Sequence, residues 1–215
     1  DSVAAIMLEL IQGEGGVNAV TDEFAQAIQT ICDEKGILLI IDEVQTGIGR
    51  TGTRFAYEQT VLKPHIVSMA KGLGGGFPIG GILGVAELFN TFNAGTHGTT
   101  FGGNPLAVAV AQTVVDIVFE SSFLENVQEL SSYLVEQLKT HLPSTFSVQG
   151  KGLMLGLYCG GEDVAPLVAK LDEAGLLTVA AGPKVIRLLP PLTVSKEEID
   201  EAVTLLKNTL TVNVV

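Results

Sequence analysis

The sequence predicts an α/β fold, because buried-looking strands alternate with an amphipathic helix and polar groups stand at the strand ends. Residues 37–42 form a continuous apolar run of the kind that is buried on both faces of a parallel sheet. Residues 66–70 form a second short strand, and Lys71 follows it directly. Ligands of such folds bind at the carboxyl ends of the strands, so we expect a site there.

Shorter patterns predict the other elements of the N-terminal half. Strands are expected over residues 3–8 and 80–85, with a glycine-rich loop over residues 11–16. Thr21 is an N-cap residue and Gly36 a typical helix stop, so a helix is expected between them. Four apolar residues of that helix are expected on one buried face: Phe24, Ile28, Ile31 and Cys32.

The pattern changes after Asn104, which indicates a second, smaller α/β domain. Asn104 suits an N-cap and Pro105 the first turn, so a long helix is expected to begin there. We therefore divide the chain into domains 1–104 and 105–215. The elements expected in the second part are helices over 104–119, 123–141 and 163–174, strands near 146–158, 177–180 and 185–188, and a last helix opened by the capping box Ser195-Lys196-Glu197-Glu198.

The charge of the chain limits its partners. Twelve basic and 24 acidic residues give a formal net charge of −12, which argues against nucleic acid and anionic membranes as partners. An anionic ligand therefore has to be bound by a few placed cations and by backbone amides. Hydrophobic residues make up 47% of the chain, which is enough for a sizeable core.

Neither a membrane span nor an export signal is expected. The longest apolar stretch, residues 106–118, is too short for a span and is interrupted by polar residues. The sequence begins at Asp1 without the basic region that is typical of a signal peptide. Cys32 and Cys159 lie far apart and form no CxxC pattern, so we expect reduced core thiols in a cytoplasmic protein.

Lys71 is the leading candidate for a reacting residue. Lysine is an amine nucleophile, and the glycine-rich stretch that follows it would let a bulky flat group approach the backbone closely. A P-loop is excluded, because its glycines precede its lysine, whereas here they follow. The pattern alone also fits a plain glycine turn with a solvated lysine.

Asp42 ends a buried-looking strand, where a carboxylate is costly unless it meets a cation or a metal. If the segment stays extended, Asp42 and Val44 share one face and the Gln45 amide lies nearby. The alternative is a strand-end cap or turn. Pyridoxal phosphate enzymes need a lysine to bind the cofactor and a carboxylate to keep its ring nitrogen protonated, so Lys71 and Asp42 together indicate such a site.

Residues 99–104 form an arrangement that suits an anion. Thr99 and Thr100 supply hydroxyls, and glycines supply amides, directly before a helix N-terminus. Ordinary capping is the alternative. His97 has no metal-ligand spacing to the other two histidines, so we treat it as structural and expect no metal site.

The motifs together resemble those of the class III (subgroup II) aminotransferases, which belong to the fold-type I pyridoxal phosphate enzymes. The similarity runs along the whole chain in order. It implies the second half of a large domain, with a mixed, mostly parallel sheet and helices, followed by a small C-terminal α/β domain. The matching segments are residues 12–16, 41–52, 70–80, 95–105, 150–154 and 186–192.

The resemblance implies a site for pyridoxal 5′-phosphate. Lys71 would bind the cofactor covalently and later move a proton between the substrate Cα and the cofactor. Asp42 would pair with the pyridine nitrogen, and Val44 would pack on the ring. The further cofactor contacts that it implies come from Glu43, from Gln45 at the phenolic oxygen and from Thr100 at the phosphate, across the interface of a homodimer.

The resemblance also implies three substrate contacts. Arg187 would bind an α-carboxylate, which a guanidinium grips with two hydrogen bonds. Glu14 would hold or release Arg187 as donor and acceptor alternate, and Thr99 would lie near the substrate. Without the resemblance, Glu14 fits a solvated loop carboxylate and Arg187 fits an arginine on a strand edge.

The reaction that the resemblance implies is transfer of an amino group from N2-acetylornithine to 2-oxoglutarate in arginine synthesis. Ornithine, succinylornithine and 4-aminobutyrate are alternative donors. Family chains are nearly twice as long, so another alternative is a non-catalytic fragment that lacks the N-terminal half of the site. Leu10 and Gln149 stand where the family usually has Pro and Arg, and both are expected to be peripheral to catalysis.

Overall fold

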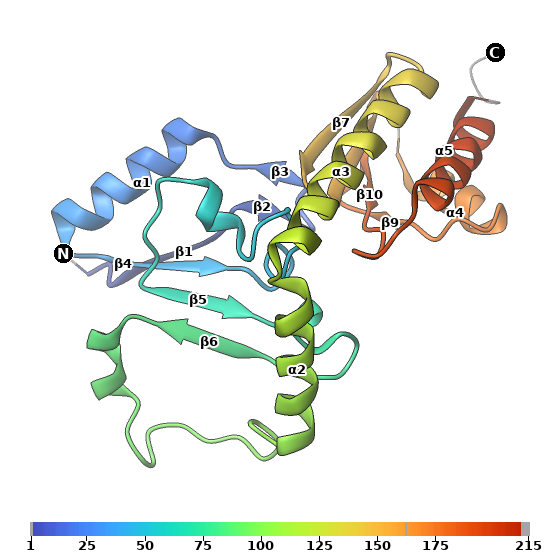
Figure 1. Cartoon of the computed structure of the whole chain (residues 1–215). Helices are drawn as coiled ribbons and strands as arrows, with labels where there is room; N and C mark the ends of the chain where they lie inside the picture. Colours follow the sequence, from blue (N-terminus) through green and yellow to red (C-terminus); the bar gives the residue numbers. More distant parts are fainter. Residues whose placement is uncertain (1, 162, 212–215) are drawn as a thin grey trace. The chain divides into compact units, whose positions relative to one another are not determined.

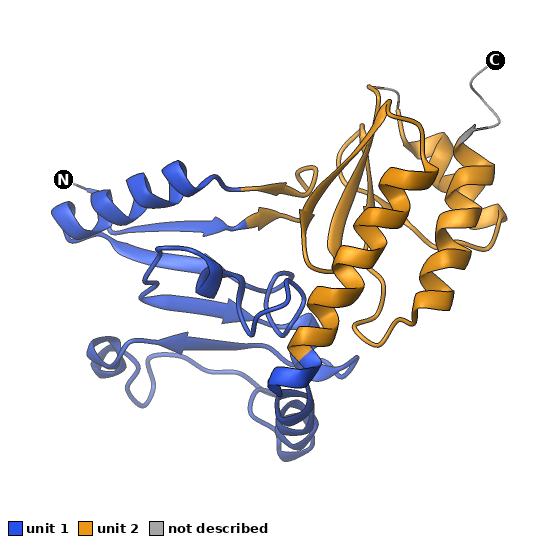
Figure 2. Ribbon diagram, turned by 45° about the horizontal axis from the view of Figure 1, so that its top comes forward, with its two compact units in different colours: residues 1–10, 20–123 blue, residues 11–19, 124–215 orange. Residues whose placement is uncertain are grey.

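The computed structural model describes residues 2–161 and 163–211 and divides into two compact units. Unit 1 comprises Asp1–Leu10 and Val20–Phe123, and unit 2 comprises Ile11–Ala19 and Leu124–Val215 (Figure 2). The division into domains 1–104 and 105–215 stays a prediction. Asp1, on which part of the export prediction rests, lies outside the described residues, as do Glu162 and residues 212–215.

Unit 1 is built on a four-stranded sheet in the order β1-β4-β5-β6 (Figure 1). The first three strands are parallel, and the fourth is antiparallel to its neighbour, which confirms the mixed, mostly parallel sheet. Asp42 pairs in register with Glu9 on one side and Ser68 on the other, so these residues stand at the carboxyl edge of the sheet. The strands are β1 (Ala5–Glu9), β4 (Leu38–Asp42), β5 (Ile66–Met69) and β6 (Gly81–Gly84).

Helix α1 (Asp22–Lys35) begins and ends at the expected caps. The Thr21 hydroxyl accepts a hydrogen bond from the Phe24 amide at 3.2 Å. Gly36 takes the left-handed conformation, with φ of 63°, that ends a helix. Acidic residues in the first turn and Lys35 in the last complement the helix dipole.

The predicted buried face of α1 is right at Cys32 and at the partly buried Ile28, which packs on the core, and wrong at two other positions. Phe24 and Ile31 are exposed, and the buried residues are Ala25, Gln29 and Cys32. Small side chains at two of these positions let the helix approach the sheet closely. The buried Gln29 is satisfied, because its amide oxygen accepts a hydrogen bond from the Lys63 backbone N–H at 2.7 Å.

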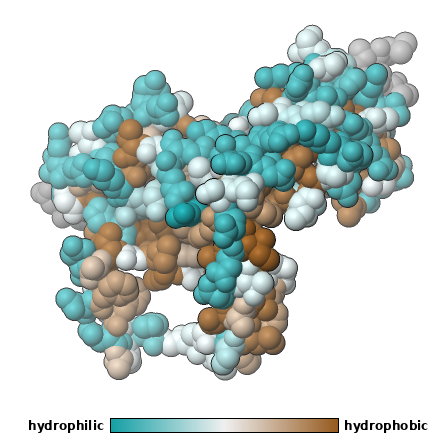
Figure 3. Space-filling view, in the orientation of Figure 1, coloured by the Kyte–Doolittle hydropathy of each residue, from teal (hydrophilic) through white to brown (hydrophobic). Residues whose placement is uncertain are grey.

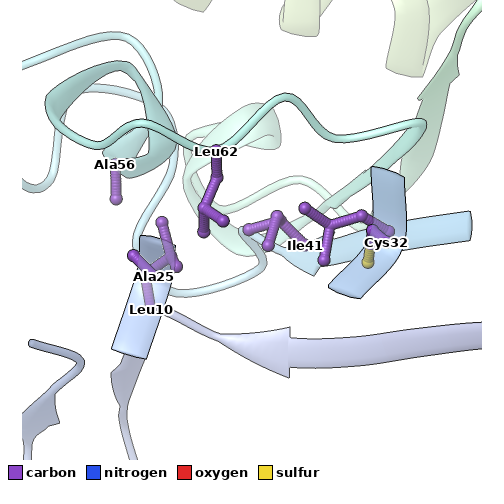
Figure 4. Packing of buried hydrophobic residues seen from close by; sticks show 7 residues of the cluster. Leu10, Ala25, Cys32, Ile41, Ala56 and Leu62 are labelled. Carbon is purple, nitrogen blue, oxygen red and sulfur yellow. The ribbon is translucent and has the colours of Figure 1, made fainter. Parts of the chain in front are cut away.

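The core of unit 1 lies between α1, β4 and the chain that links β4 to β5 (Figure 4). Leu39 and Ile41 of β4 are completely buried, and Cys32 packs with them as a free thiol. Cys159 of unit 2 is also a buried thiol, so the prediction of two core thiols is confirmed. The remaining members of the cluster are Leu10, Ala25, Ala56 and Leu62.

The long helix expected after Asn104 is confirmed as α2 (Pro105–Val118). The Asn104 side chain accepts a hydrogen bond from the Ala107 amide at 2.9 Å, and Pro105 occupies the first turn. The helix packs on η2 (Lys71–Gly74), the turn that begins with Lys71. Two further short helices complete unit 1, η1 (Ala56–Gln59) and η3 (Ala86–Thr91).

Unit 2 holds an antiparallel sheet in the order β7-β8-β10-β9 and the C-terminal helices. The expected glycine-rich loop begins with β2 (Ile11–Gln12), which pairs with β3 (Asn18–Ala19) beyond the loop. The capping box is confirmed, since Ser195 and Glu198 exchange side chain–backbone hydrogen bonds. The other elements are β7 (Phe146–Lys151), β8 (Met154–Cys159), β9 (Val179–Ala180), β10 (Val185–Leu188), α3 (Ser121–His141), which begins in unit 1, α4 (Ala165–Glu173) and α5 (Lys196–Thr211).

Within the described ranges, no single helix is both long enough and apolar enough to cross a membrane. Only α2 and α3 counted together, across the bend between them, reach the required length and composition.

Candidate active site

Asp42 is held at the carboxyl edge of the sheet in unit 1 by two hydrogen bonds to one of its oxygens. Oδ1 accepts from the Val44 backbone N–H at 2.9 Å and from the Ser68 hydroxyl at 3.2 Å. These donors fix the direction of the carboxylate. Ser68 was missed by the sequence reasoning, although it is the one polar residue of β5 and pairs in register with Asp42.

The chain does not stay extended beyond Asp42. Residues 44–50 form a run of turns, in which the Gly47 N–H donates to the Glu43 carbonyl at 2.9 Å. The expectation that Asp42 and Val44 share a strand face is therefore wrong. The hydrogen bond from the Val44 N–H to the Asp42 carboxylate fixes the position of the two residues instead. Val44 and Gln45 are both partly buried within this turn.

Glu43 points its carboxylate into the protein, with only 1% of the residue exposed. The Thr46 hydroxyl donates to one oxygen, and the Tyr57 backbone N–H donates to the other at 2.9 Å. Burial raises the pKa of Glu43, and these hydrogen bonds oppose the rise. The carboxylate ties the turn after β4 to η1, and its contact with a cofactor stays a prediction.

Lys71 begins η2 directly after β5 and has an unusual backbone conformation. Its φ of 43° lies in the left-handed region, which a residue with a side chain rarely adopts. Ile48 is also left-handed, with φ of 53°, and is buried. Ile48 lies close to η2, since a Cβ placed on Gly72 would come within 3.4 Å of the Ile48 Cβ. Strained backbone of this kind gathers at functional sites.

Thr99 and Thr100 are exposed in the segment before α2. The Thr99 hydroxyl accepts a hydrogen bond from the Gly102 N–H at 3.2 Å, which is the ordinary capping interaction weighed as an alternative. The phosphate and substrate contacts of the two threonines stay predictions. His97 packs edge-on against the Phe92 ring, with 5.4 Å between ring centroids. In the part of the chain that the structure describes, no cluster of His, Cys, Asp and Glu residues could hold a metal ion.

Glu14 and Arg187 meet in unit 2, although 173 positions separate them. One guanidinium nitrogen, Nη1, lies 2.6 Å from Glu14 Oε1 and also donates to the Gly13 carbonyl at 2.7 Å. The Arg187 side chain is 8% exposed, because all four residues of β10 are buried, whereas the Glu14 side chain is 74% exposed. The cation is therefore fixed, and the carboxylate is the member of the pair that can leave.

Gln149 contacts the loop that carries Glu14, and its peripheral place in catalysis stays a prediction. Its side-chain amide donates to the Gly16 carbonyl and to the Asn18 side-chain oxygen, the latter at 3.2 Å. It therefore holds the loop that carries Glu14. Leu10 is a buried core residue of unit 1.

The residues of unit 1 fit a cofactor that needs an amine and a carboxylate. Asp42 and Lys71 belong to the carboxyl edge of two neighbouring parallel strands, β4 and β5. The Asp42 carboxylate is oriented by two donors, and the backbone after Lys71 carries few side chains that would obstruct a flat ring. These are the two groups that pyridoxal phosphate requires.

Comparison with known proteins gives consistent matches. The family model "Aminotransferase class-III" matches residues 1–210. Acetylornithine aminotransferase of Bacillus subtilis strain 168 is 54% identical over 210 residues, which are 97% of this chain and 54% of that protein. Acetylornithine aminotransferase of Halalkalibacterium halodurans is 53% identical over 213 residues, 98% of this chain and 55% of that protein.

The solved structures that match are also aminotransferases. N-acetylornithine aminotransferase from Stenotrophomonas maltophilia K279a matches with a TM-score of 0.88 and 38% identity, covering 98% of this chain and 57% of that one. Ornithine aminotransferase from Plasmodium yoelii matches with a TM-score of 0.88 and 34% identity, covering 96% and 56%. The chain thus spans about half the length of the relatives that it matches. It belongs to the class III aminotransferase family.

Proposed function

We propose that this chain is part of a pyridoxal 5′-phosphate enzyme that transfers an amino group from N2-acetylornithine to 2-oxoglutarate. The structural observation that carries the proposal is the pair formed by the buried Arg187 and the exposed Glu14. The relatives named acetylornithine aminotransferase, at about half identity over nearly the whole chain, support this donor.

The residues of unit 1 supply the groups for the chemistry. When bound, pyridoxal phosphate provides a ring that accepts the electrons of the bond that breaks at the substrate carbon. Lys71 would hold the cofactor through its amine, and the same amine would move the proton as a general base and acid. Asp42, oriented by Ser68 and by the Val44 N–H, keeps the ring nitrogen protonated.

The pair in unit 2 lets one site accept two unlike substrates. 2-Oxoglutarate has a carboxylate next to its reacting carbon, and Arg187 binds it once Glu14 has moved away. The reacting amine of N2-acetylornithine lies at the far end of the chain, with no carboxylate beside it. For this donor Glu14 stays on Arg187, so that no buried charge is left without a partner.

We place the enzyme in the cytoplasm as a homodimer, with Thr100 of one subunit at the cofactor phosphate of the other and with Glu43 and Gln45 among the further cofactor contacts. Two buried thiols, Cys32 and Cys159, suit that compartment. The dimer is supported by apolar side chains exposed on β6 and along the chain from η3 to the start of α2 (Figure 3), since exposed apolar surface marks interaction sites. The exposed residues are Ile82, Leu83, Phe89, Phe92, Phe101, Leu106 and Val108.

The donor is tested by steady-state kinetics with N2-acetylornithine, ornithine, succinylornithine and 4-aminobutyrate. We expect the highest kcat/KM with N2-acetylornithine. Ornithine is a serious competitor, because ornithine aminotransferase structures share this fold over nearly the whole chain. A higher kcat/KM with ornithine would overturn the donor assignment and leave the reaction class intact.

The alternative that the 215 residues alone are non-catalytic is tested by colour. A cofactor bound covalently to Lys71 absorbs in the near-visible range, and borohydride bleaches it and fixes it to the lysine. We expect this signature in the holoenzyme, and its absence from the 215-residue chain mixed with pyridoxal phosphate would identify that chain as insufficient by itself. A colourless holoenzyme would contradict the cofactor proposal.

A further inference from the structure

We propose that Val17 is a positioning residue for the Glu14–Arg187 pair and thereby sets the substrate preference of the enzyme. The inference rests on the proposed function, because it assigns a role to a residue outside the reacting groups of that site. Val17 is completely buried in unit 2 and is the third residue after Glu14. It fastens the loop that carries Glu14 to the sheet that carries Arg187.

The sheet of unit 2 offers a gap where Val17 enters. Gln149 and Arg187 both pair in register with Gly156, on either side of it. Paired residues on neighbouring strands point to the same face, so the three form a row whose middle member has no side chain. That face is the one on which the loop lies, since Gln149 and Arg187 both bond to loop residues.

Val17 fills this gap closely. A Cβ placed on Gly156 would lie 2.9 Å from the Val17 Cβ, and one placed on Gly150 would lie 3.0 Å from the Val17 Cγ1. The first distance is one that real Cβ atoms essentially never show, and the second is tighter than most real Cβ contacts. The two glycines therefore form a socket that fits the valine, and Met154 and Val185 of the same face pack with Val17 in one buried cluster.

The backbone of Val17 shows that the socket determines the shape of the loop. Val17 has φ of 57°, and a β-branched residue in the left-handed region is a clear outlier. Its N–H donates to the Gln12 carbonyl at 2.9 Å, which closes the loop around Glu14. A loop strained in this way relaxes to other conformations unless packing holds it. The burial of Val17 provides that packing.

The position of Glu14 then depends on an anchor that never touches a substrate. The Glu14 side chain is 74% exposed, so its place beside Arg187 depends on the loop that carries it. Besides the hydrogen bond from Arg187 itself to the Gly13 carbonyl, two contacts anchor this loop to the sheet, Val17 in the socket and the Gln149 amide on the Gly16 carbonyl. Weakening either anchor should lower the occupancy of the ion pair and leave Arg187 more available to a carboxylate.

The test is Val17→Ala in the holoenzyme, with binding of glutarate as the main readout. Glutarate is a dicarboxylate that cannot react, and it competes with Glu14 for Arg187. We expect Val17→Ala to bind glutarate about threefold or more tightly and to lose kcat/KM for N2-acetylornithine. The matched control is Val203→Ala, which removes the same atoms from a buried site on α5 of the same unit and should leave glutarate affinity unchanged. General damage to the fold weakens binding, so tighter binding separates positioning from structure.

A double-mutant cycle with Glu14→Gln separates this inference from the proposed function. If Val17 acts through Glu14, Val17→Ala should change glutarate affinity in the wild-type background and should have no effect in the Glu14→Gln background. An equal effect in both backgrounds, or weaker binding in Val17→Ala alone, overturns the inference. The proposed exchange of Glu14 for a substrate carboxylate at Arg187 is then left intact. A Glu14→Gln variant that binds glutarate no more tightly than wild type overturns the proposed exchange at Arg187, and the role of Val17 with it.

A second variant keeps the test decisive if Val17→Ala does not fold. Gln149→Ala removes the other anchor of the loop from a partly buried position and leaves the core intact. It should shift glutarate affinity in the same direction, again only while Glu14 is present. Unchanged affinity in a folded Gln149→Ala enzyme, with Val17→Ala unfolded, counts against positioning by the loop.

Discussion

Unit 1 and unit 2 hold their site residues in opposite ways. In unit 2, Arg187 lies in β10, a strand in which every residue is buried, and the loop opposite is fastened by Val17. In unit 1, Lys71 and Thr100 are exposed, and every residue of β6 is exposed as well. Unit 2 thus encloses Arg187 in a packed core, whereas unit 1 presents Lys71 and Thr100 on an open surface.

The difference indicates a division of labour. In the proposed function, unit 1 carries the groups that react, which must be reachable by a cofactor and by a moving proton. Unit 2 then carries a fixed cation, whose proposed role is to select among substrates by charge. Substitutions in unit 1 should therefore lower the rate with every substrate, and substitutions in unit 2 should change the ratio between substrates.

Lys71→Ala tests the first half of that statement and should have the largest effect. Covalent attachment and proton transfer are lost together, and general acid–base catalysis alone contributes about 10²–10⁴-fold. Activity should fall by at least that factor with donor and acceptor alike, while the cofactor still binds non-covalently. Single-turnover rates with each substrate measure it. A mutant within tenfold of wild type would remove Lys71 from the chemistry.

Asp42→Asn should have the next largest effect. Asparagine keeps the shape and can still accept the hydrogen bonds from Ser68 and from the Val44 N–H. It removes the charge that keeps the ring nitrogen protonated, so loss of the substrate proton should slow far more than formation of the covalent bond to the substrate. Stopped-flow spectroscopy resolves the two steps. Equal slowing of both would identify Asp42 as a structural cap.

Arg187→Ala and Glu14→Gln test the second half. A hydrogen bond to a charged group contributes about 1.5–3 kcal/mol, so Arg187→Ala should raise the KM for 2-oxoglutarate by roughly ten- to a hundredfold. The half-reaction with N2-acetylornithine should change much less. Glu14→Gln should leave Arg187 permanently available and shift preference toward α-amino donors such as glutamate. If both variants lose rate equally with donor and acceptor, the pair is structural. The proposed division of labour between the units is then wrong.

The sequence predicted most where the cause is local. Thr21, Gly36, Asn104 and Ser195 mark helix ends because a cap acts within a few residues, and the structure confirms all four. Prediction failed where contacts with residues far along the chain decide which side chains are buried. The buried face of α1 depends on a bond from Gln29 to the backbone 34 positions away, which no helical period reveals.

The candidate site divides in the same way. Lys71 and Asp42 stand out in their own segments, and the Glu14–Arg187 pairing was expected only through the resemblance to a family. The roles of Ser68, Val17 and Gln149 depend on strand register and on packing between segments far apart in the chain. Such contacts leave no local pattern, apart from a lone serine in an apolar strand and glycines where side chains would collide.

Glu43→Gln should have the smallest effect, and it sharpens the comparison of the two glutamates, one buried in unit 1 and one exposed in unit 2. Burial raises the pKa of Glu43 in the folded protein above its ordinary value of 4.5. Between these two pKa values the folded state binds more protons than the unfolded state, so the free energy of unfolding falls as pH rises through that window. Glutamine has no proton to gain, yet it can still pair with Thr46 and with the Tyr57 N–H.

The variant should therefore lose this part of the pH dependence. As pH rises from about 4.5 toward neutrality, the melting temperature of the variant minus that of the wild type should increase. Thermal unfolding at a series of pH values measures it, with Glu34→Gln on the exposed side of α1 as the control that should follow the wild type. If Glu43→Gln keeps the full pH dependence, the folded protein does not hold Glu43 as a desolvated carboxyl. The turn after Asp42 would then be open to solvent. Glu43 would no longer be an exception to the open surface of unit 1.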